Sequence, residues 1–146
     1  MATRIRDRDR GAKALIKRLS AASKPITVTV GIHEAEGSAD HDGATVADVG
    51  SFHEFGLGVP QRSFIRDWSD ENEAENKDRL RKIGQAVVAG KLASVEQGLE
   101  RFGLFAVGSI QQRMAAGIEP PKADGTPATL IDQGILRSSI TSKVNK

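Results

Sequence analysis

The chain has no cysteine and no tyrosine, and only 4% of its 146 residues are aromatic. Without cysteine, disulfide frameworks, thiolate zinc sites and thiol catalysis are all excluded. No apolar run approaches the ~20 residues that span a bilayer, and no apolar signal-peptide core follows the basic N-terminus. We therefore expect a single domain, 1–146, that stays in the cytoplasm unless it leaves within a particle, with no membrane as partner.

The formal net charge of +2 is spread unevenly along the chain. Residues 1–24 hold eight Lys or Arg against two Asp, a balance of +6, and are expected to form a basic N-terminal helix or arm. Residues 67–80 hold six acids against two bases, a balance of −4. Opposite charge on two segments of one subunit suits head-to-tail contacts between copies, but charge runs of this kind are more often solvated helix faces.

Periodicity predicts an α+β fold, a small antiparallel sheet packed against two long helices plus an N-terminal helix. The N-terminal helix is expected over 4–22, with Gly11 favouring a start near Ala12, and strict apolar alternation predicts a strand over 26–32. Residues 33–44 and 118–129 are expected to be flexible loops. Thr45, three residues before Asp48, predicts a capping box that starts a helix.

Glycine and proline mark where these elements end. Gly56 is expected at a helix C-terminus in a left-handed conformation, and Pro60 favours extended chain over 57–66. Two long helices should follow, capped by Ser69 and Ser94. Their expected buried stripes are Leu80, Ile83 and Val87 in the first helix, and Leu99, Phe102, Ala106, Ile110 and Met114 in the second. Gly117 should end the second helix, Asp132 should cap a short turn through Arg137, and 140–144 could add a strand.

None of the residue patterns indicates catalysis. His53-Glu54 is similar to the start of a zinc-protease helix, but that motif needs a second His four residues later, and position 57 is Leu. Asp40-His41-Asp42-Gly43 lacks the remaining ligands of a calcium loop. His33 with Glu34 and Glu36 offers no third ligand type, and no nucleophile motif is present. We expect neither an enzyme nor a cofactor or metal.

Two basic features leave alternatives open. Arg4, Arg6, Arg8 and Arg10 could contact DNA phosphates non-specifically, could order against a neighbouring subunit, or could be solvated. A basic DNA-binding accessory protein is accordingly the alternative function. In an extended segment, Arg62, Phe64 and Arg66 would share one side. That side could form buried or interfacial pairs with carboxylates, or the arginines could be exposed.

Two motifs resemble the neck and tail-completion (head–tail joining) proteins of long-tailed bacteriophages. In that family a helix ends in His-Glu-(Phe/Tyr)-Gly and is followed by Ile-Pro-x-Arg-x-Phe-(Ile/Leu)-Arg. Two long helices come next, and then Leu-Ile-Asp-Thr-Gly-x-Leu-Arg-x-Ser-Ile. The corresponding segments here are 53–56, 59–66 and 130–140, in the same order over roughly 26–144. Gln133 replaces the usual Thr, and the short segment after Ile140 implies a smaller final sheet or one completed by a neighbour.

The resemblance implies a structural virion protein that forms a homomeric ring, commonly a hexamer. The ring would complete the tail and join it to the head, between head-side connector or adaptor proteins and tail tube or tail terminator proteins, with genome DNA passing through its lumen. Localisation would be the virion neck or tail, and the host cytoplasm during assembly. The motif residues would then be structural or interface positions: His53, Glu54, Phe55, Gly56, Pro60, Arg62, Phe64, Arg66, Asp132, Gly134, Leu136 and Arg137.

Overall fold

The computed structural model describes residues 9–23, 25–38, 40–41, 43–121, 123, 125 and 134–146, with only the backbone of 21, 22, 40 and 41. The fold is α+β, as predicted. Its helices are α1 (Ala12–Ala22), α2 (Glu34–Gly37), α3 (Val46–Phe55), α4 (Arg66–Glu71), α5 (Glu73–Val88), α6 (Val95–Ala116) and α7 (Gly134–Ser138). Its strands are β1 (Thr27–Ile32), β2 (Asp40–His41), β3 (Ala44–Thr45) and β4 (Ile140–Asn145).

The main sheet joins the predicted strand near residue 26 to the C-terminal one. β1 and β4 are antiparallel, with Thr27 opposite Asn145 and Ile32 opposite Ile140. Alternate residues of both strands face α6, and Gly103 lets that helix approach, since an added Cβ would lie 2.6 Å from Ser142 Oγ. Among the described residues, no third strand pairs with β1 or β4, so each strand has one free edge.

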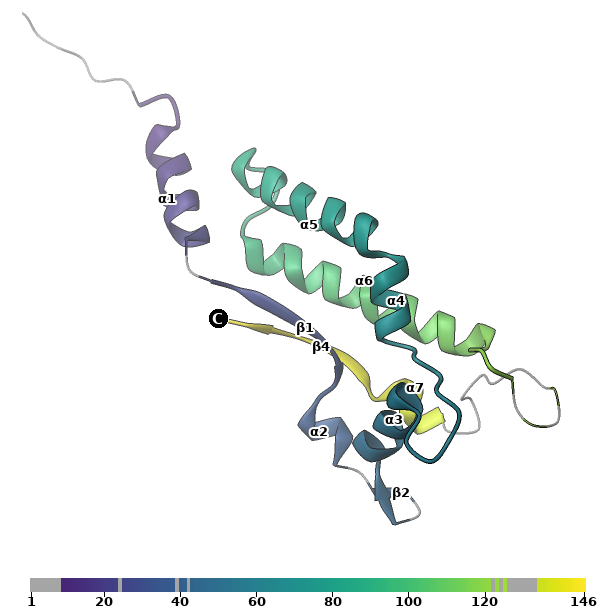
Figure 1. The fold of residues 1–146 in the computed structure, drawn as a ribbon. Helices are drawn as coiled ribbons and strands as arrows, with labels where there is room; N and C mark the ends of the chain where they lie inside the picture. Colours follow the sequence, from purple (N-terminus) through teal and green to yellow (C-terminus); the bar gives the residue numbers. More distant parts are fainter. Residues whose placement is uncertain are drawn as a thin grey trace, which may run out of the picture.

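The core lies where α6 crosses the sheet, and residues of α3, α4 and α7 join it (Figure 1). Its buried members are Val46, Phe64, Trp68, Ala106, Ile110, Met114, Ile118, Leu136 and Ile140. Helix α5 runs beside the longer helix α6 on the side away from the sheet. Gly98 sets that approach, because an added Cβ there would lie 2.2 Å from Ile83 Cγ2. α1 lies at one end of the molecule, and α2, α3 and α7 gather at the other.

Local capping signals placed both ends of α3 and of α6 correctly. Thr45 and Asp48 form the predicted capping box of α3, and Gly56 ends that helix at φ 71°. Ser94 caps α6 by accepting a hydrogen bond from the Gln97 N–H, and Gly117 follows its last residue. These capping interactions form within one turn of the chain, so the sequence predicts them without knowledge of the fold.

Several expectations were wrong. The segment 33–44 is not simply a loop, because it contains α2, β2 and the start of β3. Ser69 does not begin a helix but lies inside α4, and α5 begins after Asn72. Leu80 is exposed rather than part of a buried stripe, whereas Val87 is buried and Ile83 packs on α6 at Gly98. The loop expected to be flexible from residue 118 starts with Ile118 in the core.

Candidate functional site around Glu54

The first long motif folds around the carboxylate of Glu54. Glu54 Oε1 accepts hydrogen bonds from Ser63 Oγ at 2.6 Å and from the Arg66 N–H at 2.9 Å. Its Oε2 accepts from the backbone N–H groups of Phe64 at 2.9 Å and Ile65 at 3.1 Å. We call these five residues the Glu54 cluster. The three N–H groups belong to the start of α4, so Glu54 supplies the N-terminal cap of a helix that has no capping side chain of its own.

The turn after α3 brings the two halves of this cluster together. Gly56 adopts the left-handed conformation, and an added Cβ would lie 3.0 Å from Gln61 Cβ, so glycine suits both the backbone and the space. The returning chain is fixed by the Arg62 N–H donating to the His53 carbonyl at 2.8 Å, and by Gln61 Nε2 donating to the Glu54 carbonyl at 3.1 Å. The motif spacing therefore places Glu54 directly opposite residues 63–66.

Burial and hydrogen bonding act in opposite directions on the Glu54 carboxyl. Burial raises its pKa, but the hydrogen bonds from Ser63 and from the N–H groups of Arg66, Ile65 and Phe64 together outweigh burial, and the net pKa lies below the usual 4.5. The carboxylate is therefore ionised at neutral pH. Each carboxylate oxygen accepts hydrogen bonds from two donors, so the Glu54 side chain fixes residues 63–66 against α3.

Arg62 matches neither of the two interpretations of its sequence context. It is buried, and it donates to backbone carbonyls, from Nε to Pro120 O at 2.8 Å and from Nη2 to Pro121 O at 3.1 Å. Arg62 thus ties the start of the 118–129 segment to the core. Phe64 lies in that core, while Arg66 is exposed and stacks its guanidinium 5.2 Å from the centre of the Phe55 ring. The three side chains do not share one side, because the chain turns into α4 after Phe64.

His53 lies in the last turn of α3. Burial lowers its pKa, and the nearby positive charge of Arg62 lowers it further. Its Nδ1 is buried and has no hydrogen-bond partner in the described part of the chain. Within that same part, no group of three or more His, Cys, Asp or Glu side chains could hold a metal ion.

The remaining predicted positions divide between core, surface and residues outside the described ranges. Leu136 is buried in the core, and the Arg137 carbonyl accepts a hydrogen bond from Gln111 Nε2 at 3.1 Å. Gly134, expected in a turn, is instead the first residue of α7. Pro60 is exposed, and Asp132 lies outside the described residues.

Sequence reasoning missed that Glu54 is a cap for a helix twelve residues later, because capping motifs are read over three or four residues. The exposed apolar side chains around it were missed too. Phe55 is 56% exposed, Leu57 is 55% exposed, and Phe52 and Val59 are also exposed. We call these four residues the motif knob. They lie on the last turn of α3 and on the loop after it.

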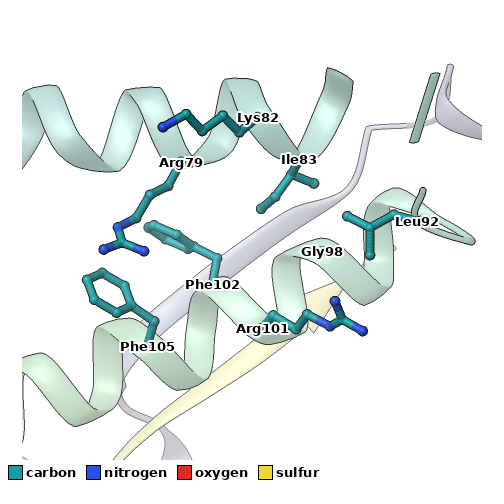
Figure 2. A pocket seen from close by; sticks show the side chains of 8 residues that line it. All are labelled: Arg79, Lys82, Ile83, Leu92, Gly98, Arg101, Phe102 and Phe105. Carbon is teal, nitrogen blue, oxygen red and sulfur yellow. The ribbon is translucent and has the colours of Figure 1, made fainter. Parts of the chain in front are cut away.

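A pocket of about 310 Å³ opens between α5 and α6 (Figure 2). The Arg79 guanidinium sits 3.8 Å above the centre of the Phe105 ring, and Phe102 lies beside it with 6.3 Å between ring centres. Arg79 and Lys82 also pair along α5, with Glu75 at 2.6 Å and Asp78 at 2.6 Å respectively. These ion pairs offset much of the positive charge beside the pocket.

A wider cleft of about 510 Å³ lies between α3 and the start of α4. We call it the α3–α4 cleft. Its apolar lining includes Ile32, Phe64 and Ile65, and Phe55 of the motif knob lies at it. Asp70 and Arg66 are its exposed charged residues. The cleft is thus an apolar surface directly beside the Glu54 cluster.

The chain was compared with known proteins in three ways: neither protein-family models, nor curated proteins, nor solved structures gave a match. No helix in the described ranges is both long enough and apolar enough to cross a bilayer.

Proposed function

We propose that this protein is a structural component of a phage neck or tail, a homomeric ring that completes the tail and joins it to the head. The observation that carries the proposal is the motif knob. The residues that resemble the neck family form a turn, held by the Glu54 cluster, that exposes Phe55 together with Phe52 and Leu57, which lie next to the motif segments. Contiguous exposed apolar side chains of this size are typical of protein interfaces.

The Glu54 cluster supports a scaffolding role for the same motif. Its carboxylate, Ser63 hydroxyl and backbone N–H groups satisfy one another, so the motif fixes the shape of the knob. The free edges of the two-stranded sheet offer further backbone groups to a neighbouring subunit or to a tail protein. In this proposal the ring, most simply a hexamer, contacts head-side connector or adaptor proteins on one face and tail tube or terminator proteins on the other. Genome DNA passes through its lumen, and the protein carries out no catalysis.

Assembly assays test this proposal. Electron microscopy and mass measurement of the purified protein should find a closed ring, and phage lacking the protein should accumulate filled heads and finished tails that are unjoined. A protein that remains monomeric and joins no neck or tail particle would contradict the proposal.

Leu57→Ser removes an apolar contact worth about 1.5–3 kcal/mol if buried. It should weaken ring formation by roughly 10-fold or more, with Leu104→Ser, on the exposed side of α6, as the matched control.

The exposed basic residues on α1 and just before it favour a second candidate, a DNA-binding accessory protein. Arg10, Lys13 and Lys17 are exposed and have no acidic partner among the described residues, while Arg4, Arg6 and Arg8 lie outside them. Non-specific phosphate contact predicts duplex binding that weakens steeply with salt. Loss of that binding when Arg4, Arg6, Arg8 and Arg10 become Ala, with ring formation unaffected, would favour this candidate.

A further inference from the structure

The N-terminal helix α1 is amphipathic, and its contact with α5 of the same chain covers its apolar stripe only in part. Leu15, Ile16 and Leu19 share one stripe, and their exposed fractions are 37%, 62% and 49%. Arg18 is also partly buried, where it approaches Gly90 at the end of α5. A helix of 11 residues is marginal by itself in water, because its few hydrogen bonds barely offset the cost of nucleation. α1 therefore needs a partner surface.

The α3–α4 cleft has the complementary properties. Its lining is largely apolar, its exposed cation Arg66 stacks on Phe55, and acidic side chains lie at it and beside it. Asp70 lines the cleft, and Glu34 lines a smaller hollow that shares Ile32 and Ala47 with it. Neither acid makes an ion pair within the described ranges. On α1, Lys13 and Lys17 border the apolar stripe, one turn apart.

We propose that α1 of one copy docks in the α3–α4 cleft of the next copy, which rests on the proposed ring function. Leu15, Ile16 and Leu19 enter the cleft, as an amphipathic helix lies in an apolar groove. Lys13 and Lys17 face Asp70 and Glu34, so the contact is favourable in charge as well as in burial.

The position of the two surfaces sets the symmetry of this contact. α1 precedes β1, while Ile32 at the far end of β1 lines the cleft, so the two surfaces lie at opposite ends of the molecule (Figure 1). A contact between unlike surfaces at opposite ends is heterologous and repeats from copy to copy. Such a contact closes into a ring when the rotation between copies allows it.

The absence of cysteine makes a disulfide-trapping experiment clean. Ser20→Cys lies one turn after Ile16 on α1, and Ser69→Cys lines the cleft of a second copy. Mixing the two full-length single variants under mild oxidation should give a disulfide-linked heterodimer. The matched control pairs Ser20→Cys with Gln85→Cys, at an exposed position near the C-terminal end of α5. This control pair should cross-link at least tenfold less. Equal yields from the two pairs would overturn the inference.

Charge reversal supplies an independent test. Lys13→Glu with Lys17→Glu should lower the cross-linking yield at limiting protein concentration by roughly 3- to 30-fold, since two exposed ion pairs are replaced by repulsion. Glu34→Lys with Asp70→Lys in the other copy should lower it similarly, and combining both reversed surfaces should restore it. Reversal without any loss, or loss without restoration, would overturn the docking.

The two proposals fail in different ways. If microscopy finds closed rings but Ser20→Cys and Ser69→Cys do not cross-link, the docking of α1 is wrong and the ring proposal stands. If the cross-link forms with the expected charge dependence but the protein joins no neck or tail particle, the docking stands and the neck function is wrong.

Discussion

Removing the negative charge of Glu54 should destabilise the protein far more than removing an exposed carboxylate. In Glu54→Gln, the side-chain oxygen can still accept from two N–H groups, and Ser63 can rotate its hydroxyl to accept from the new amide. At least one backbone N–H at the start of α4 then faces a donor and loses its partner. A buried unsatisfied donor costs about 1–3 kcal/mol, and the weaker remaining hydrogen bonds add to that.

We therefore expect Glu54→Gln to lower the free energy of unfolding by about 2–4 kcal/mol, a large part of the roughly 5–15 kcal/mol typical of a domain. Urea denaturation followed by circular dichroism, at one fixed protein concentration, would measure it. Glu100→Gln, at an exposed position on α6, is the matched control and should change stability by less than about 0.5 kcal/mol. Equal unfolding midpoints for the two variants would refute the capping role of Glu54.

The pH dependence of stability provides a second test of the role of Glu54. The folded pKa of Glu54 is lower than its unfolded value of 4.5, so the unfolded state binds more protons as the pH falls. Its contribution to stability is present above pH 4.5 and is lost as the pH falls through the folded pKa. The stability difference between the natural chain and Glu54→Gln should thus stay constant above about pH 5.5 and shrink below pH 4.5. A difference that grows in acid would refute the sign of this argument.

Further outcomes concern other parts of the fold. Gly98→Ala would place a Cβ 2.2 Å from Ile83 Cγ2 and should cost about 1–3 kcal/mol of stability. Gly108→Ala meets open space and should stabilise the protein by up to ~1 kcal/mol. Thermal melts should therefore show a lower midpoint for Gly98→Ala and a higher one for Gly108→Ala. Burial and Arg62 lower the folded pKa of His53, so neutral His53 contributes stability above its ordinary pKa of 6.5, and this stability is lost as the pH falls through the folded pKa. His53→Asn should therefore reduce the slope of the unfolding free energy against pH between about pH 7 and 5. An unchanged slope would contradict this. Thr45→Ala removes the cap of α3 and should cost about 1 kcal/mol in urea denaturation.

The sequence by itself determined the elements whose signals lie within a few residues. Alternation fixed β1, the Thr45–Asp48 box and Ser94 fixed the starts of α3 and α6, and Gly56 and Gly117 fixed their ends. Capping and alternation depend on hydrogen bonds and side-chain directions within one turn or one strand, so a single sequence displays them.

Only the tertiary structure decided what the motif residues do. The donors to the Glu54 carboxylate lie 9 to 12 residues away, and Arg62 reaches carbonyls 58 and 59 residues away. No local pattern encodes such partners, because the turn after α3 and the crossing of α6 bring them together. The same long-range packing buries Phe64, leaves Phe55 and Leu80 exposed, and leaves the apolar stripe of α1 only partly covered by its own chain.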